Sequence, residues 1–292
     1  MGFTWLALLF IALSSLAYSA LDLLRKLLVE RMQPLPLLFF LSIGQLPAFL
    51  VWSTFEPMRI GWGYVLPAGV SVVLNIVANI LFLEAVRLSP LSLTVPFLSL
   101  TPVFTAALAA PMLGEVPTSR QVAGILLVVI GALRLNLSRG TAATPRALWH
   151  AFRNERGSVL MTFVALLWSV ASPLDKLAMG HASIPLHGFV LNAGVGIGVL
   201  VVLVGRGRAD ELKWSQSGGG PMVLAILASV VGLAFLLLAI ATSWVGLVET
   251  LKRAIGSVLA LILGYRVFAE PMTSNKLLGV LLMMAGVGLV VV

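Results

Sequence analysis

The sequence predicts an all-α integral membrane protein with ten transmembrane helices, arranged as two inverted five-helix repeats. Hydrophobic residues make up 60% of the 292 residues, charged residues make up only 10%, and the mean hydropathy is +1.07. Soluble domains carry about 25% charged residues, so this chain has too little polar surface to fold in water. Two further observations support the same fold class: a regular series of apolar segments and an internal repeat.

Ten apolar segments follow one another along the chain, each near the roughly 20 residues that a transmembrane helix needs. Proline, glycine or charged residues separate the segments, and such residues end or interrupt helices. The predicted helices are 3–28, 34–54, 62–87, 90–113, 118–138, 158–180, 185–205, 221–242, 245–268 and 273–292.

Two connections between these segments are longer than the others. Residues 139–157 contain four arginines and divide the chain into halves, and residues 206–220 contain three basic residues and three consecutive glycines. Neither connection is typical of an extra domain. We therefore predict a first repeat over 1–138, a basic central loop over 139–157 and a second repeat over 158–292.

The two halves share a pattern that recurs after 155 residues. In each copy a glutamate precedes a glycine by nine residues, and a second glycine follows seven residues later. These residues are Glu115, Gly124 and Gly131 in the first copy and Glu270, Gly279 and Gly286 in the second. Because five helices per copy is an odd number, the second copy must enter the membrane from the opposite face. This predicts an inverted repeat with a substrate site at the repeat interface near mid-membrane.

The repeated residues have expected structural roles. We expect the glycines to form helix-packing faces. We expect Glu115 and Glu270 to cap equivalent helix starts at opposite membrane faces, because a carboxylate stabilises a helix N-terminus. A role of the two glutamates in gating is the alternative.

Composition excludes several classes of protein. The net charge of +8 does not indicate a nucleic-acid partner, because the cations mostly flank apolar segments as in membrane proteins. Cysteine is absent, and His150, His181 and His187 have no metal-ligand spacing, so we predict no metal site and no cofactor. The sequence contains no Walker A loop, G-x-S-x-G or H-E-x-x-H motif, which argues against an enzyme and against transport driven by nucleotide hydrolysis.

Residues 84–136 carry a series of features in a fairly specific order. The series is the helix end Glu84-Ala85-Val86-Arg87, the prolines Pro90, Pro96 and Pro102, the turn Gly114-Glu115 and the glycine-spaced last helix. This order resembles the EamA domain of the drug/metabolite transporter superfamily, and residues 248–270 resemble a second EamA repeat that lacks these prolines. The resemblance implies a ten-helix secondary transporter of small metabolites or drugs, often an exporter.

Two indications of the membrane orientation oppose each other. The odd-numbered loops hold 14 Lys and Arg residues and the even-numbered loops hold 5, which places both termini outside by the positive-inside rule. The resemblance implies that both termini are cytoplasmic. We expect a multi-pass protein of a bacterial inner membrane, acting as a monomer or weak dimer, with the lipid bilayer and a small-molecule substrate as partners.

Three charged residues lie on one face of the ninth predicted helix. Glu249, Lys252 and Arg253 are spaced i, i+3 and i+4, with the acid before the bases. A charge within a span costs about 2.5–3.5 kcal/mol on insertion scales and normally faces a cavity or a partner. We predict that at least one of the three contacts substrate or the coupling proton, so that Glu249→Gln weakens transport or its pH dependence. The alternative is an interfacial helix end whose cations reach the headgroups.

The first and sixth predicted helices carry charged residues near their ends. Asp22 precedes Arg25 and Lys26 by three and four residues, and Asp175 directly precedes Lys176. At an offset of 153 residues we interpret Asp22 and Asp175 as repeat counterparts, and the family resemblance implies a lysine late in both helices. These residues are candidates for substrate or proton binding, with salt bridges at the headgroups as the alternative.

The third predicted helix carries polar residues that are candidates for lining a pore. Asn75 and Asn79 are spaced i and i+4, and Glu84 lies near the helix end. Trp168, inside the sixth predicted helix, is a candidate for stacking on a ligand. The alternatives are hydrogen bonds between helices, worth about 0.6 kcal/mol each, and core packing of the indole.

The leading functional hypothesis is a secondary transporter that moves a small metabolite or drug by alternating access, as an exporter driven by a proton gradient or by exchange. The alternative from another class is a flippase or an enzyme that handles a charged lipid, which would need wide lateral openings and a catalytic His/Asp pair in a loop. A channel subunit is a third alternative, although it would not need paired intramembrane charges.

Overall fold

The computed structural model describes residues 5–56, 59–89, 97–137, 156–212, 219–268 and 273–291. In this part of the chain it contains ten α-helices, two short 3-10 helices and no β-strand. The α-helices are α1 (Trp5–Val29), α2 (Pro34–Ser53), α3 (Val65–Leu88), α5 (Thr101–Leu113), α6 (Ser119–Leu137), α8 (Arg156–Met179), α9 (Ile184–Gly205), α10 (Gly219–Thr242), α11 (Val245–Phe268) and α12 (Ser274–Val291). The 3-10 helices are η1 (Trp62–Tyr64) and η2 (Ala209–Leu212).

The helices follow the predicted segments closely, with one exception. Apart from α5, each helix starts within three residues of its predicted start, because the prolines and charged turns that separate the segments also end the helices. The fourth predicted helix, 90–113, is interrupted, since Phe97 and Leu98 are helical, residues 99 and 100 form a turn and α5 begins at Thr101. Pro102 lies in the first turn of α5, where a proline starts a helix without losing a hydrogen bond. Residues 90–96 lie outside the described part of the chain.

Six helical segments are long and apolar enough to cross a membrane. They are α1, α2, η1 with α3, α8, α9 and α10, and α5 and most of α12 are shorter apolar helices. Helix α11 carries the charged residues Glu249, Lys252 and Arg253 in its first half. The predicted basic loop 139–157 and Glu270 lie outside the described residues, except that residues 156 and 157 begin α8.

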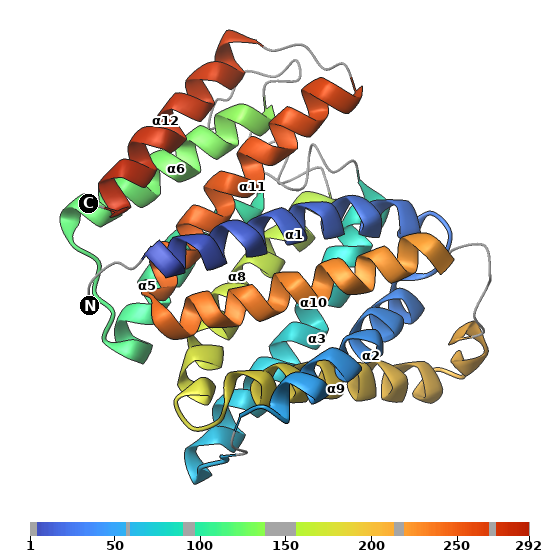
Figure 1. Cartoon of the computed structure of the whole chain (residues 1–292). Helices are drawn as coiled ribbons and strands as arrows, with labels where there is room; N and C mark the ends of the chain where they lie inside the picture. The colour runs from blue at the N-terminus through green and yellow to red at the C-terminus, as the bar shows by residue number, and fades with distance from the viewer. Residues whose placement is uncertain are drawn as a thin grey trace.

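Helices from the first half of the chain pack on helices from the second half. Helix α6 lies along α12, α2 along α9, α3 along α8 and α1 along α10. In Figure 1, α6, α11 and α12 lie at one end of the bundle, α2 and α9 lie at the other, and α1 runs beside α10 between them. The largest buried cluster contains side chains of α1, α2, α3, α8, α9 and α10, so the core lies between the two halves.

Glycines bring α6 and α12 into close antiparallel contact. A Cβ atom built on Gly124 would lie 2.6 Å from the backbone oxygen of Gly286, and one built on Gly131 would lie 2.6 Å from that of Gly279. Ascending residue numbers on α6 therefore face descending numbers on α12. The predicted packing role of these glycine-bearing faces is confirmed.

A valine at position 124 is expected to destabilise the protein by about 1–3 kcal/mol, the range for overpacking a tightly packed site. The atom that the new Cβ would meet belongs to the backbone of Gly286, which cannot move aside as a flexible side chain can. Thermal unfolding of the purified protein in detergent measures the effect. Gly288→Val is the matched control, because a Cβ at Gly288 on α12 meets nothing within 4 Å. Equal losses in the two variants would contradict the close contact.

Candidate functional site

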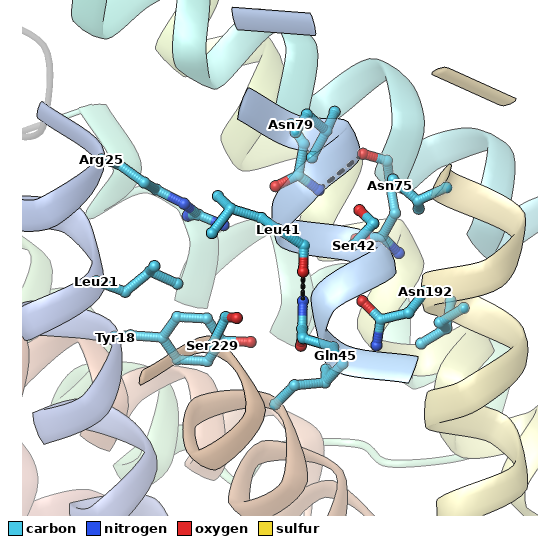
Figure 2. Close-up of a pocket in the computed structure, with 14 residues that line it drawn as sticks. Tyr18, Leu21, Arg25, Leu41, Ser42, Gln45, Asn75, Asn79, Asn192 and Ser229 are labelled. Carbon is cyan, nitrogen blue, oxygen red and sulfur yellow. Dashed lines mark hydrogen bonds between the residues drawn. The ribbon is translucent and has the colours of Figure 1, made fainter. Parts of the chain in front are cut away.

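A cavity of about 90 Å³ lies between α1, α2 and α3 of the first half and α9 and α10 of the second. Figure 2 shows polar side chains from these helices turned toward one another around it. The polar lining residues are Tyr18, Arg25, Ser42, Gln45, Asn75, Asn79, Asn192 and Ser229. The remaining lining residues are leucines and one valine, so the cavity is a polar space inside an apolar bundle.

Four amide side chains of the cavity share one hydrogen-bonding pattern. Each amide nitrogen donates to the carbonyl oxygen four residues earlier in its own helix, at 2.8–3.0 Å. The amide oxygens accept no hydrogen bond from the described residues, and that of Gln45 is buried without a partner. These side chains are Gln45, Asn75, Asn79 and Asn192. The cavity therefore presents up to four free acceptors to a ligand.

Arg25 is the one charged residue among those that line the cavity. The residue is only 8% exposed, its guanidinium carbon lies 5.4 Å from the centre of the Phe82 ring, and its Nε has no hydrogen-bond partner among the described residues. Its Nη1 lies 3.5 Å from Asp22 Oδ1. A guanidinium with unused donors can bind a carboxylate through two parallel hydrogen bonds. The cavity thus combines one cationic donor with neutral acceptors.

Two of the residues predicted on the third helix line this cavity, and one does not. Asn75 and Asn79 belong to the lining. Glu84 instead pairs with Arg87 at 3.9 Å near the end of α3. Trp168 is not a lining residue either, and its ring packs on Phe82 with 5.6 Å between the ring centres. Phe82 contacts Arg25 as well, so Trp168 acts on the cavity only through other side chains.

The three charges of α11 are largely compensated within the bundle. Glu249 is 1% exposed and accepts hydrogen bonds from Lys252 Nζ at 2.8 Å and from Ser172 Oγ at 3.2 Å. Arg253 Nε is buried without a hydrogen-bond partner among the described residues. None of the three residues lines the cavity. Lys252 Nζ nevertheless lies 5.9 Å from the ring centre of Tyr18, and Tyr18 is a lining residue.

The lysines near the ends of α1 and α8 have corresponding contacts. Lys26 Nζ donates to the carbonyl of Val86 in the last turn of α3 at 3.2 Å, and Lys176 Nζ donates to the carbonyl of Ser243, just after α10, at 2.6 Å. Lys26 and Lys176 are 150 residues apart. These contacts favour an offset of 150, which places Arg25 opposite Asp175, over the offset of 153 that pairs Asp22 with Asp175.

Glu115 connects three segments from both halves of the chain. One carboxylate oxygen lies 2.5 Å from Lys176 Nζ, and the other accepts the backbone N–H of Val245, the first residue of α11, at 2.9 Å. Helix α6 begins with its own reciprocal cap between Thr118 and Gln121. Glu115 therefore caps α11 of the other half, and the described cap of α6 is formed by Thr118 and Gln121. Its predicted counterpart Glu270 lies outside the described residues.

Asp175 belongs to a buried hydrogen-bonded chain that sequence reasoning did not predict. Its Oδ1 lies 3.2 Å from Nε2 of His187 and also accepts the hydroxyl of Ser71. His187 is 0% exposed, and its Nδ1 lies 3.1 Å from the Tyr64 hydroxyl. In the sequence, Asp175 and His187 are 12 residues apart with Pro185 between them. This spacing alone does not predict that the two side chains are in contact.

A comparison with known protein families identifies the domain in the first half of the chain. The EamA-like transporter family matches residues 5–137. The chain carries an EamA domain. This match to the first half of the chain, together with the apolar helices, suggests a multi-pass membrane transporter of the drug/metabolite type. The EamA domain supplies Tyr18, Arg25, Gln45, Asn75 and Asn79 to the cavity.

The solved structures support the fold over both halves, including the part beyond the EamA domain match. One of them, described only as "Crystal structure of protein", is 19% identical and covers 97% of this chain and 97% of its own, with a TM-score of 0.72. At this identity the likeness shows the fold alone. No curated protein matches the chain.

Proposed function

We propose that the chain is a secondary transporter that moves a small polar metabolite by alternating access, as an exporter driven by a proton gradient or by exchange. The observation that carries the proposal is the polar cavity that residues of both halves line. A site between two halves that pack on each other can open to either side when the halves rock, which is the expected arrangement in secondary transporters. We place the protein in a bacterial inner membrane, working as a monomer or weak dimer.

Alternating access requires two related halves, and the packing supports ten spans in two inverted repeats over 1–138 and 158–292. Gly124 lies against Gly286 and Gly131 against Gly279, so exchanging the repeat counterparts reproduces the same two contacts. Exchange also converts the α1–α10 contact into the α8–α3 contact, and both are extensive. A two-fold axis that exchanges antiparallel helices lies perpendicular to them. For membrane-spanning helices such an axis lies in the membrane plane.

The size and chemistry of the cavity narrow the substrate. Pockets for drug-sized ligands measure about 300–1,000 Å³, whereas this cavity measures about 90 Å³, which favours a small metabolite over a drug. Arg25 suits a carboxylate, and the amide oxygens of Gln45, Asn75, Asn79 and Asn192 suit an ammonium or hydroxyl group. We therefore propose a small solute that carries both an anionic group and hydrogen-bond donors.

We propose that the charged residues of α11 influence the cavity indirectly, through a residue that lines it. Glu249 and Lys252 form a hydrogen-bonded pair at 2.8 Å, and Lys252 Nζ lies over the Tyr18 ring at 5.9 Å from its centre. Through Tyr18 the pair can influence both the position of the phenol and the electrostatic potential at the cavity, because charges in a low-dielectric interior act over longer distances than in water.

A matched series of three-carbon probes tests the proposed function. Alanine carries a carboxylate and an ammonium group, propionate carries only the carboxylate, propylamine carries only the ammonium group, and propionamide carries no charge. We expect proteoliposomes to exchange labelled alanine, unlabelled alanine to compete best, and propionate to compete better than propylamine or propionamide. Liposomes without protein control for leakage. Equal competition by all four probes, or no exchange above the control, would contradict the proposal.

A further inference from the structure

A buried acid–histidine pair lies outside the cavity and is not needed to form it. Asp175 on α8 and His187 near the start of α9 are 3.2 Å apart, and both are buried, with His187 at 0% exposure. In the neutral ring, Nε2–H donates to the carboxylate and Nδ1 accepts the hydroxyl proton of Tyr64. Every polar atom of the imidazole is therefore engaged, and a second ring proton can be held without breaking the contact to Asp175.

The pair is connected to the cavity by hydrogen bonds. Asp175 accepts the hydroxyl of Ser71 on α3, and Ser71 Oγ in turn accepts a hydrogen bond from Asn75 Nδ2 at 3.2 Å. Asn75 lines the cavity. A ligand that engages the Asn75 amide can therefore change the hydrogen bonding of Asp175 through one intervening hydroxyl. The connection also crosses from α8 of the second half to α3 of the first.

At the end of the hydrogen-bonded chain away from the cavity, Tyr64 lies near the start of α3 and the α8–α9 turn. Tyr64 ends η1, directly before α3, and belongs to a small buried cluster with Ala178 near the end of α8. Trp62, two residues earlier, is fully exposed, and Gly61 N–H donates to the carbonyl of His181 in the turn between α8 and α9. Tyr64 thus separates His187 from the surface at the α8–α9 turn.

The repeat does not account for the pair. Offset 150, which relates Lys26 to Lys176, places Arg25 opposite Asp175 and Leu37 opposite His187. The first half therefore holds no acid and no imidazole at these positions. The pair is therefore not a feature that the two halves share, and the common scaffold alone does not require it.

Other charged and titratable groups near the pair have separate partners. Lys176, next to Asp175 in sequence, donates to Glu115 and Ser243. Glu249 of α11 bonds to Ser172 and Lys252. His181 lies in the α8–α9 turn against Gly61 and Gly63, and Tyr18 and Arg25 lie at the cavity. From α2, the apolar Phe49 faces Gly188, the neighbour of His187. In the described part of the chain, the side chains that hydrogen-bond to the pair are Tyr64 and Ser71.

We propose that Asp175 and His187 together form the site that binds the coupling proton of the transporter. The inference rests on the proposed transport function and assigns the proton to a place distinct from the substrate cavity. Imidazole is the side chain whose charge changes most readily near neutral pH, and here its Nε2 lies 3.2 Å from a carboxylate oxygen. Proton binding at Nδ1 turns this atom into a donor, so the Tyr64 hydroxyl must accept where it donated before. The change of charge beside Asp175 also reaches Ser71 and Asn75 through the hydrogen bonds that join them.

Separating coupled flux from exchange tests the assignment in reconstituted liposomes with labelled alanine as the probe. In the wild-type protein a pH gradient is expected to change net alanine flux several-fold. His187→Gln and Asp175→Asn keep the shape and part of the hydrogen bonding, so they are expected to keep exchange at equal pH within about twofold while net flux no longer responds to the gradient. His181→Gln, a histidine at the neighbouring turn, is the matched control and is expected to keep both properties.

The outcomes distinguish this inference from the proposed function. A wild-type protein that exchanges alanine but ignores the pH gradient, or variants that respond to it like the wild type, would overturn the proton site and leave transport intact. If no probe is exchanged, a substrate-free measurement decides: nitrogen NMR of His187 in a His150→Gln/His181→Gln background. A ring that changes protonation between about pH 5 and pH 8 supports the site, and one that does not change overturns it.

Discussion

Replacing Arg25 with glutamine is expected to weaken the binding of alanine and propionate at least 30-fold, a loss of about 2 kcal/mol or more. Removing one member of a buried charged hydrogen bond costs about 2–5 kcal/mol, and 1.4 kcal/mol corresponds to a factor of ten. Arg25 is the charged lining residue of the cavity, so no neighbour in the lining can replace it. Ligand-induced thermal stabilisation, which follows from binding to the folded state, measures the change.

Two further variants separate the lost ligand contact from structural damage. Arg25→Lys keeps the charge but loses the planar fork, and is expected to fall between the wild type and Arg25→Gln. The double variant Arg25→Gln/Asp22→Asn removes the carboxylate that lies 3.5 Å from Arg25, so it leaves no unpaired charge from this pair. Propylamine and propionamide serve as internal controls, since neither has a carboxylate. Wild-type affinity for propionate in Arg25→Gln would show that the anionic group binds elsewhere.

Replacing Lys176 with methionine is expected to lower the free energy of unfolding by about 3 kcal/mol or more. Breaking a buried ion pair costs about 3–5 kcal/mol, because the remaining charge stays buried without compensation. Lys176 and Glu115 have side chains only 20% and 16% exposed, and Lys176 also holds the carbonyl of Ser243. Unfolding in detergent with increasing denaturant measures the loss.

The repeat supplies a matched control for this change. Lys26 makes the corresponding carbonyl contact, but its carboxylate partner Glu30 is 3.9 Å away with a side chain 63% exposed. Exposed ion pairs contribute about 0–1 kcal/mol, so Lys26→Met is expected to cost far less than Lys176→Met. Similar losses in the two variants would show that the carbonyl contacts, and not the pairing with Glu115, carry the stability.

The positions of most helices were predictable from the sequence because hydropathy and proline placement act locally. The start of α9, for example, follows from Pro185, which lies in its first turn. The start of α5 was not predictable in the same way. The apolar segment continues from residue 90, and hydropathy alone does not show that Pro102 marks the first turn.

The residues of the candidate site were predictable only where they lie on the same helix at helical spacing. Asn75 and Asn79 lie one turn apart on α3, so their common face was visible in the sequence. His187 was missed because its partners Tyr64 and Asp175 lie on other elements. The role of Glu115 at α11 depends on contacts between residues 130 positions apart, which local patterns do not contain.

The pairing of helices between the two halves has a consequence for how the protein is made. Helices α1, α2, α3 and α6 have their main partners in α10, α9, α8 and α12, all of which are translated later. At about 5–20 residues per second, synthesis of the second half takes roughly 7 to 27 s. During that time the first five helices are inserted without their partners, and their polar faces depend on insertion factors or on one another. Substitutions in the second half are therefore expected to affect the first half already during biogenesis. The two halves, expressed as separate polypeptides, are expected to assemble only when they are produced together.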